Sequence, residues 1–293
     1  SSDLAGSTTV VIQNGSSDVT TTGVSNLQLD MLDTHKTATT VSGDASLTSL
    51  VVLDANDAGV SITLANDAAG QTVTVGGVDG TNDAASISAN VAVSLDIDRD
   101  HDVDLLTLSG NTNDVNYTVA DSASALKVTF AGSKDVTLTL DANDAEALKT
   151  TDSLTAGATN VVLTGLYTDN DLDLTGVNAD TVTVSNDIIA TAVEFNDSQA
   201  IVLTGGQNTV LDLHQKNGND GTATVTLSSK TTGFANVELA TDGFANLTVN
   251  AGDLTVQTLT IAATQNDTNV TVVGTNDITG TTIAAGDGDV KIS

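Results

Sequence analysis

Short apolar alternations recur along this chain every ten or eleven residues, and this rhythm constrains the fold more than any other feature. The clearest seven form two series in which neighbouring centres lie 10 or 11 residues apart: 51–53, 62–64 and 73–75, then 161–163, 172–174, 182–184 and 193–195. Strands of this length joined by short turns are typical of a β-sandwich or of a wound β-solenoid. The sequence therefore predicts an all-β protein.

The segments between these alternations carry the residues of tight turns. The chain has no proline, so its turns must be made by Gly, Asn and Asp, which accept left-handed backbone angles at little cost. The phrase DANDA follows a Val/Leu run at 54–58 and again at 141–145. We expect a helical turn or short helix only at 141–150 and at 27–36.

One repeat is clear enough to align. Residues 231–240 (TTGFANVELA) and 241–250 (TDGFANLTVN) match at five of ten positions, and residues 23–29 (GVSNLQL) have the same form. In each phrase we expect Gly to end a turn, the next residue to pack inward, and Asn to cap or stack between neighbouring strands.

The scarcity of aromatic residues separates the two candidate folds. Aromatics supply only 2% of the chain, so we expect a core of Val, Leu, Ile and Ala. Small aliphatic side chains suit the narrow interior of a β-solenoid, whereas β-sandwich modules, the alternative, commonly bury aromatic anchors. We therefore expect residues 1–293 to form one elongated β-solenoid of degenerate 10–11-residue strand-turn units, part of a longer chain, with a weak boundary near 96–104.

Charge and cysteine content exclude several classes of function. The formal net charge is −30, from 38 acidic and 8 basic residues, which argues against nucleic acid as a partner because binding it needs a basic face. The absence of Cys removes disulfides, zinc–thiolate sites and thiol nucleophiles. No apolar stretch is long enough to predict a transmembrane helix.

The strongest candidate for a metal site is a run with an acid at every second position: Asp96, Asp98, Asp100, Asp102 and Asp104. In an extended strand these carboxylates would lie about 7 Å apart on one face and repel one another, by roughly 0.6 kcal/mol per neighbouring pair in water. A bound cation would relieve that repulsion, and calcium prefers such hard oxygen ligands. The run lacks the Gly and Glu of an EF-hand loop. A solvated acidic edge that discourages aggregation is the alternative reading.

Three Asp/Asn-rich turns are further candidates for calcium ligands, because each offers several oxygens from one loop. They contain Asp54, Asn56 and Asp57; Asp141, Asn143 and Asp144; and Asp169, Asn170, Asp171 and Asp173. A single turn of this kind is more often only a turn, since Asn and Asp hydrogen-bond their own backbone.

No nucleophile elbow, zinc-protease, dinucleotide or phosphate-loop motif occurs, so we expect no catalytic activity. A carbohydrate-active enzyme on a β-helix is the weaker alternative, because paired carboxylates cannot be recognised from spacing alone.

The phrase G-Φ-x-N-Φ-x-Φ (Φ, apolar) in GVSNLQL, GFANVEL and GFANLTV, together with the Thr/Val/Asp/Asn/Gly bias, resembles bacterial surface-layer proteins and RTX-like adhesins exported by type I secretion. The chain departs from the RTX pattern in lacking a true GGxGxDxUx nonapeptide. The resemblance implies a β-solenoid that folds and self-assembles on the bacterial cell surface when it binds calcium.

These features lead to one main hypothesis and one close alternative. The first is an extracellular structural subunit of a surface layer or filament that self-associates with calcium held in its acidic turns, with cell-surface polysaccharide as a further expected partner. The alternative is a calcium-stabilised adhesin module that binds a glycan or protein. A lattice subunit assembles by itself on adding calcium, whereas an adhesin module stays monomeric.

Overall fold

The structure is a computed structural model of the chain. It describes residues 7–12, 19–31, 39–43, 46–55, 60–64, 71–77, 84–97, 105–121, 127–145, 148–165, 167, 171–184, 192–195, 200–203, 208–215, 221–227, 234–242, 244–250, 256–263, 269–273, 281–284 and 290–292. The chain divides into two compact units. Unit 1 comprises Ser1–Leu140 and Ala147–Asn160, and unit 2 comprises Asp141–Glu146 and Val161–Ser293.

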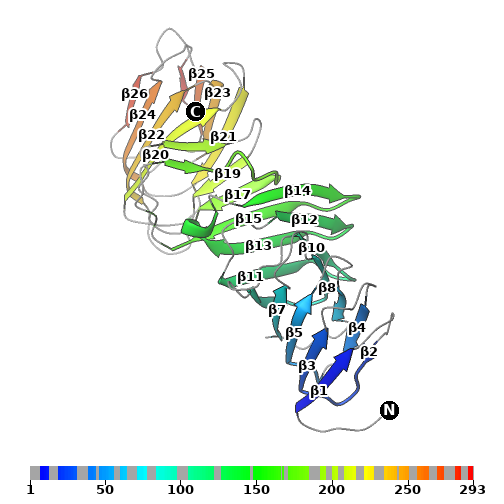
Figure 1. The fold of residues 1–293 in the computed structure, drawn as a ribbon. Helices are drawn as coiled ribbons and strands as arrows, with labels where there is room; N and C mark the ends of the chain where they lie inside the picture. The colour runs from blue at the N-terminus through cyan, green and yellow to red at the C-terminus, as the bar shows by residue number, and fades with distance from the viewer. Residues whose placement is uncertain are drawn as a thin grey trace. The chain divides into compact units, whose positions relative to one another are not determined.

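Unit 1 is built from two stacks of parallel strands (Figure 1). The odd-numbered stack runs in order through β1 (Ser7–Ile12), β3 (Asn26–Met31), β5 (Ser49–Ala55), β7 (Gln71–Gly77), β9 (Val93–Ile97), β11 (Val115–Asp121) and β13 (Val136–Asp141). The even-numbered stack runs through β2 (Val19–Thr20), β4 (Thr39–Gly43), β6 (Val60–Leu64), β8 (Ala84–Ala89), β10 (Leu105–Gly110), β12 (Lys127–Gly132) and β14 (Lys149–Leu154).

Unit 2 repeats this arrangement. Its odd-numbered stack contains β17 (Thr181–Val184), β19 (Ala200–Leu203), β21 (Gly221–Leu227), β23 (Phe244–Asn250), β25 (Asn269–Val273) and β27 (Val290–Ile292). Its even-numbered stack contains β16 (Asp171–Asp173), β18 (Ala192–Phe195), β20 (Asn208–Gln215), β22 (Phe234–Asp242), β24 (Val256–Ala263) and β26 (Thr281–Ala284). The strand β15 (Thr159–Thr164) lies at the division between the two units.

The pairing identifies the fold as a β-solenoid. Within each stack, a strand pairs in parallel with the strand two places along the chain, so a coil contributes one strand to each stack. Asn26 lies opposite Ser49 and Ser49 opposite Thr72, which gives a coil of 23 residues at both steps. Two of the predicted 10–11-residue units therefore make one coil. A β-sandwich is wrong for the strands described, because its sheets are antiparallel.

The interior is filled by the inward residues of each strand, as the alternating pattern predicts. Leu27, Leu50, Val73 and Leu95 occupy one register position on successive odd strands, and each is at most 1% exposed. In β8 the side chains alternate between half-buried and buried along the whole strand. Stacking of like aliphatic residues thus forms a continuous narrow core.

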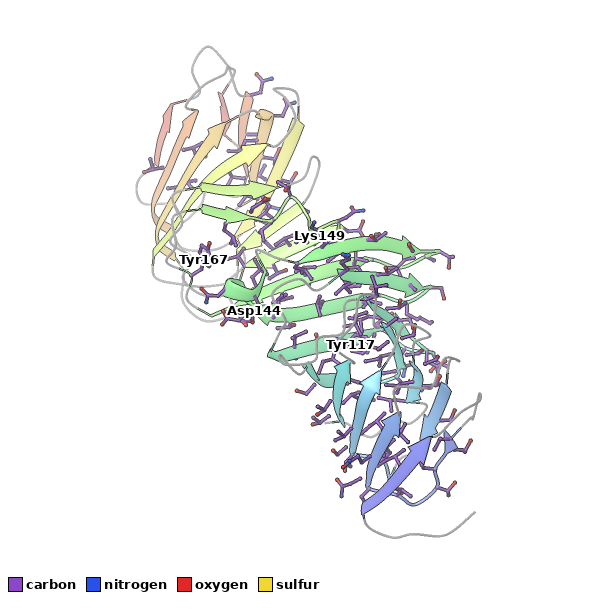
Figure 2. All side chains as sticks on the ribbon, viewed as in Figure 1. Tyr117, Asp144, Lys149 and Tyr167 are labelled. Carbon is purple, nitrogen blue, oxygen red and sulfur yellow. The ribbon has the colours of Figure 1, made fainter. Side chains whose placement is uncertain are left out.

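Aromatic residues take a larger part in that core than composition suggested. Tyr117, Tyr167 and Phe130 are the largest fully buried side chains described. The Tyr117 hydroxyl lies 2.8 Å from the carbonyl oxygen of Ser109 and 3.1 Å from that of Ile87, so its polar end is hydrogen-bonded inside the coil (Figure 2). Burial raises the pKa of the Tyr117 phenol well above its ordinary value.

The aligned repeat corresponds to half a coil. Its two copies form β22 and β23, one strand from each stack of unit 2. In the related phrase at 23–29, Gly23 has φ +71 and Val24 is only 4% exposed, which confirms the expected turn and inward residue. The expected stacking of Asn is also present, because the Asn269 side-chain amide donates to the Asn246 side-chain oxygen at 3.2 Å.

Helix is confined to one turn in the part of the chain described. A 3-10 helix covers Ala142–Asp144, inside the segment 141–150 where a helical turn was predicted. The prediction of a helical turn at 27–36 is wrong for residues 27–31, which form most of β3. There, Leu27 and Leu29 are both buried and pair with β5, and stacking onto the next coil outweighs local preference.

Side chains in the turns also link successive coils of unit 1. The Asp135 N–H donates to Asp114 Oδ1 at 3.1 Å, and the Ala158 N–H donates to Asp135 Oδ1 at 2.8 Å. Asn90 Oδ1 accepts hydrogen bonds from the backbone N–H and the hydroxyl of Thr112, both at 2.9 Å. Short polar residues at turns therefore supply acceptors for backbone groups of the following coil.

Candidate metal sites

Three of the four predicted acidic segments follow odd-numbered strands. Residues 54–57 begin at the end of β5, residues 96–104 at the end of β9, and residues 141–144 at the end of β13. Each of these three segments therefore begins where the chain leaves an odd-numbered strand toward the next even-numbered strand. Within unit 1, β5 and β9 belong to one parallel stack, so their acidic ends lie along one edge of that stack.

The structure adds a partner for Asp96 that sequence reasoning missed. In the register of the odd stack, Asp96 lies opposite Thr74 on β7 and opposite Asp121 on β11. Partners on neighbouring strands lie about 4.8 Å apart. Asp121 is the last residue of its strand, and a bulge between Val119 and Asp121 brings it into register with Asp96. The two acids are 25 positions apart in the sequence, which hides this pairing.

This register places two acidic residues at paired backbone positions on neighbouring strands. Two unit negative charges about 5 Å apart repel by about 0.8 kcal/mol in water and by about 3 kcal/mol at an effective dielectric constant of 20. Asp30 in β3 and Asp54 in β5 lie near the same ends of their strands. Acidic residues therefore recur at the ends of odd-numbered strands in unit 1.

Several of the predicted ligands cannot be placed. The structure positions the backbone of Asp54 and Asp96 in β5 and β9. Eight predicted ligands lie outside the described residues: Asp98, Asp100, Asp102, Asp104, Asn56, Asp57, Asp169 and Asn170. For these positions, calcium coordination stays a prediction.

The cluster at Asp141, Asn143 and Asp144 is well defined and forms a capped turn. Asp141 Oδ1 accepts a hydrogen bond from the Asn143 backbone N–H at 2.9 Å and another from its side-chain amide at 2.6 Å. Asp141 thereby caps the 3-10 helix at its N-terminus, while Asp144 is half-buried within it (Figure 2). The other carboxylate oxygen of Asp141 faces Gly165, at a point that a Cβ atom would overlap.

The fourth cluster also contains a capped turn. Asp173 ends β16, and its Oδ1 accepts hydrogen bonds from the Thr175 backbone N–H at 2.8 Å and from the Thr175 hydroxyl at 2.5 Å. Asp171 begins the same strand and pairs with Ala192. The cluster thus joins a strand to a turn, which was the simpler reading of its sequence.

Among the side chains that the structure describes, no three His, Cys, Asp or Glu residues gather into a group that could hold a metal ion. Asp141 and Asp173 each keep one carboxylate oxygen outside the hydrogen bonds given above. In the ranges described, no helix has the length and apolar character needed to cross a membrane. No protein-family model, curated protein or solved structure matches the chain.

Proposed function

We propose that this chain is a structural subunit of a bacterial surface layer or surface filament, assembled outside the cell with calcium bound along the acidic edge of its β-solenoid. The fold supports a structural role, because stacked coils present extended faces. The G-Φ-x-N-Φ-x-Φ phrase and its resemblance to surface-layer proteins support the location and the assembly.

The observation that carries the calcium part of the proposal is the register of Asp96 with Asp121. Two acids on neighbouring strands repel while the site is empty, and a divalent cation converts that repulsion into attraction. The effect opposes folding without calcium and favours it with calcium, because a metal that binds only the folded state stabilises it by mass action.

The size of the effect follows from calcium affinities typical of extracellular modules. With a dissociation constant of about 0.1–1 mM and 10 mM calcium, one site stabilises the folded state by about 1.4–2.7 kcal/mol. Several sites along one edge would multiply this gain. In a calcium-poor cytoplasm the same chain would be less stable and therefore easier to export.

Size-exclusion chromatography with light scattering tests the proposal, together with electron microscopy of the products. The full chain is first measured in EDTA, then in 10 mM calcium, with 10 mM magnesium as the matched control. We expect a monomer in EDTA or magnesium and large ordered assemblies in calcium. A chain that stays monomeric in calcium would contradict the assembly role, and an adhesin module would then fit better.

A further inference from the structure

The outer face of the even-numbered stack in unit 1 carries no acidic residue among the described side chains of its outward rows, in a chain of net charge −30. Half-buried Asp152 of β14 lies at an inward position, opposite Phe130. Three rows of outward side chains cross this face in register. The rows are Ala84, Leu105, Lys127 and Lys149; Ser61, Ser86, Thr107, Thr129 and Thr151; and Thr20, Ser42, Thr63, Ser88, Ser109, Ala131 and Ser153. All of them are exposed or half-buried, and eleven of the sixteen carry a hydroxyl group. We call this surface the hydroxyl face.

Two lysines give the hydroxyl face a positive end. Lys127 lies opposite Lys149 on the neighbouring strand, and both side chains are exposed. Lys149 is labelled in Figure 2. Neither forms an ion pair with another residue that the structure describes. Leu105, in the same row, is 38% exposed and is unit 1's one exposed large apolar side chain among the described residues. Like charges on adjacent strands repel, so this arrangement favours an anionic partner.

A matching pair of acids lies in the turns that precede the odd strands of the same unit. Asp114 and Asp135 are both exposed and precede β11 and β13. The hydrogen bond from the Asp135 N–H to Asp114 Oδ1 stacks them one coil apart. Lys127 and Lys149 are also one coil apart, so the two pairs share the spacing of neighbouring parallel strands, about 4.8 Å.

We propose that the hydroxyl face binds a second copy of this chain, with Lys127 and Lys149 of one copy against Asp114 and Asp135 of the next. This inference rests on the proposed function, self-assembly, and names the surfaces that meet. In a highly acidic chain, a surface free of carboxylates avoids repulsion by the acids of the next copy, and the small hydroxyl-bearing side chains leave this one flat. Because the contact joins two different surfaces, it propagates from copy to copy into an open array.

The area of the hydroxyl face is that of a weak contact, which would be repeated many times in an array. Seven strands about 4.8 Å apart and three rows about 7 Å apart cover about 400 Å². This is about half of what each partner buries in a standard protein interface. A single contact is therefore weak, and repetition along an array strengthens the assembly through multivalency.

Sedimentation equilibrium of the full chain in 10 mM calcium tests the contact. The variants are K127Q/K149Q, D114N/D135N and the combination of all four substitutions. Asn keeps the side-chain oxygen that accepts the backbone N–H of the next coil, so the fold contact is retained. K291Q is the control, because Lys291 lies in β27 of unit 2, outside both surfaces of the proposed contact. Circular dichroism and thermal melting check that each variant folds.

Each double variant is expected to weaken association about 2- to 25-fold, since each of the two exposed ion pairs contributes a factor of about 1.4 to 5. The variant with all four substitutions should associate as strongly as either double variant, because each double variant already removes the same ion pairs. K291Q should associate like the wild type. Unchanged association in the double variants, or fully additive losses, would overturn the face-to-turn contact while leaving calcium-driven assembly intact. A wild-type chain that does not associate at all would overturn both proposals.

Discussion

Replacing Tyr117 with Phe separates two contributions of one buried side chain, the hydrogen bond of its hydroxyl and the ionisation of its phenol. Tyr117 is fully buried, and its hydroxyl contacts the carbonyl oxygens of Ser109 and Ile87. Phe fills the same space, so the core packing is retained. Loss of the hydroxyl should lower the free energy of unfolding by about 1 kcal/mol at pH 7.

At high pH the ionisation of the phenol lowers the stability of the wild type but not that of the Phe variant. Burial raises the pKa of Tyr117 in the folded state above its unfolded value of about 10. The unfolded chain therefore loses this proton first as the pH rises. The stabilisation is fully present below about pH 10 and falls by about 1.4 kcal/mol by pH 11. The Phe variant has no phenol at this position and escapes that loss, so the two proteins should become about equally stable near pH 11.

The assay is urea unfolding followed by far-UV circular dichroism at pH 7, 9, 10 and 11, at one fixed calcium concentration. All other titrating groups are common to both proteins, so their effects cancel in the difference. We expect a deficit of about 1 kcal/mol for the variant from pH 7 to 9 that disappears near pH 11. A difference in stability that stays constant up to pH 11 would refute the reasoning that Tyr117 is buried in its neutral form.

Two further predictions concern the turns of unit 1. Asn90→Ala removes the acceptor of two hydrogen bonds from the next coil and should cost about 1 kcal/mol, whereas Asn111→Ala, at an exposed position nearby, should change stability by less than about 0.5 kcal/mol in the same urea assay. Gly157→Ala should cost about 2 kcal/mol or more, because φ is +95 and the new Cβ would lie 2.7 Å from the backbone of Lys134; Gly23→Ala, with φ +71 and open space, should cost about 1 kcal/mol. Equal melting temperatures within either pair of variants would contradict these accounts.

The strands were predictable because alternation directly reflects burial. The segments 51–53, 62–64 and 182–184 all fall within strands, since one buried face imposes a period of two residues. The prediction of a core made only of Val, Leu, Ile and Ala was partly right. Buried Tyr117 and Phe130 were not foreseen, because aromatic content is a property of the whole chain, whereas burial depends on which residues stack over one another.

The candidate metal sites could also be predicted only in part. Sequence patterns located the acidic turns after β5, β9 and β13, because Asp and Asn mark the ends of strands. They could not give the pairing of Asp96 with Asp121, or of Lys127 with Lys149. Those pairs depend on the length of each coil, which varies with the loops between strands and with a bulge in β11. Register is a property of the stacked coils and is not encoded by any one segment.

Calcium-dependent thermal unfolding of the D96N/D121N variant tests the central claim most directly. The wild type is compared with this variant and with D114N/D135N, which removes the same charge from another pair of acids one coil apart. Measurements are made in EDTA and in 10 mM calcium at protein concentrations too low for association. The account predicts that calcium raises the melting temperature of the wild type and of D114N/D135N by roughly 3–10 °C. It also predicts that D96N/D121N is more stable than the wild type in EDTA and gains much less from calcium. An equal calcium response in all three proteins would contradict the account.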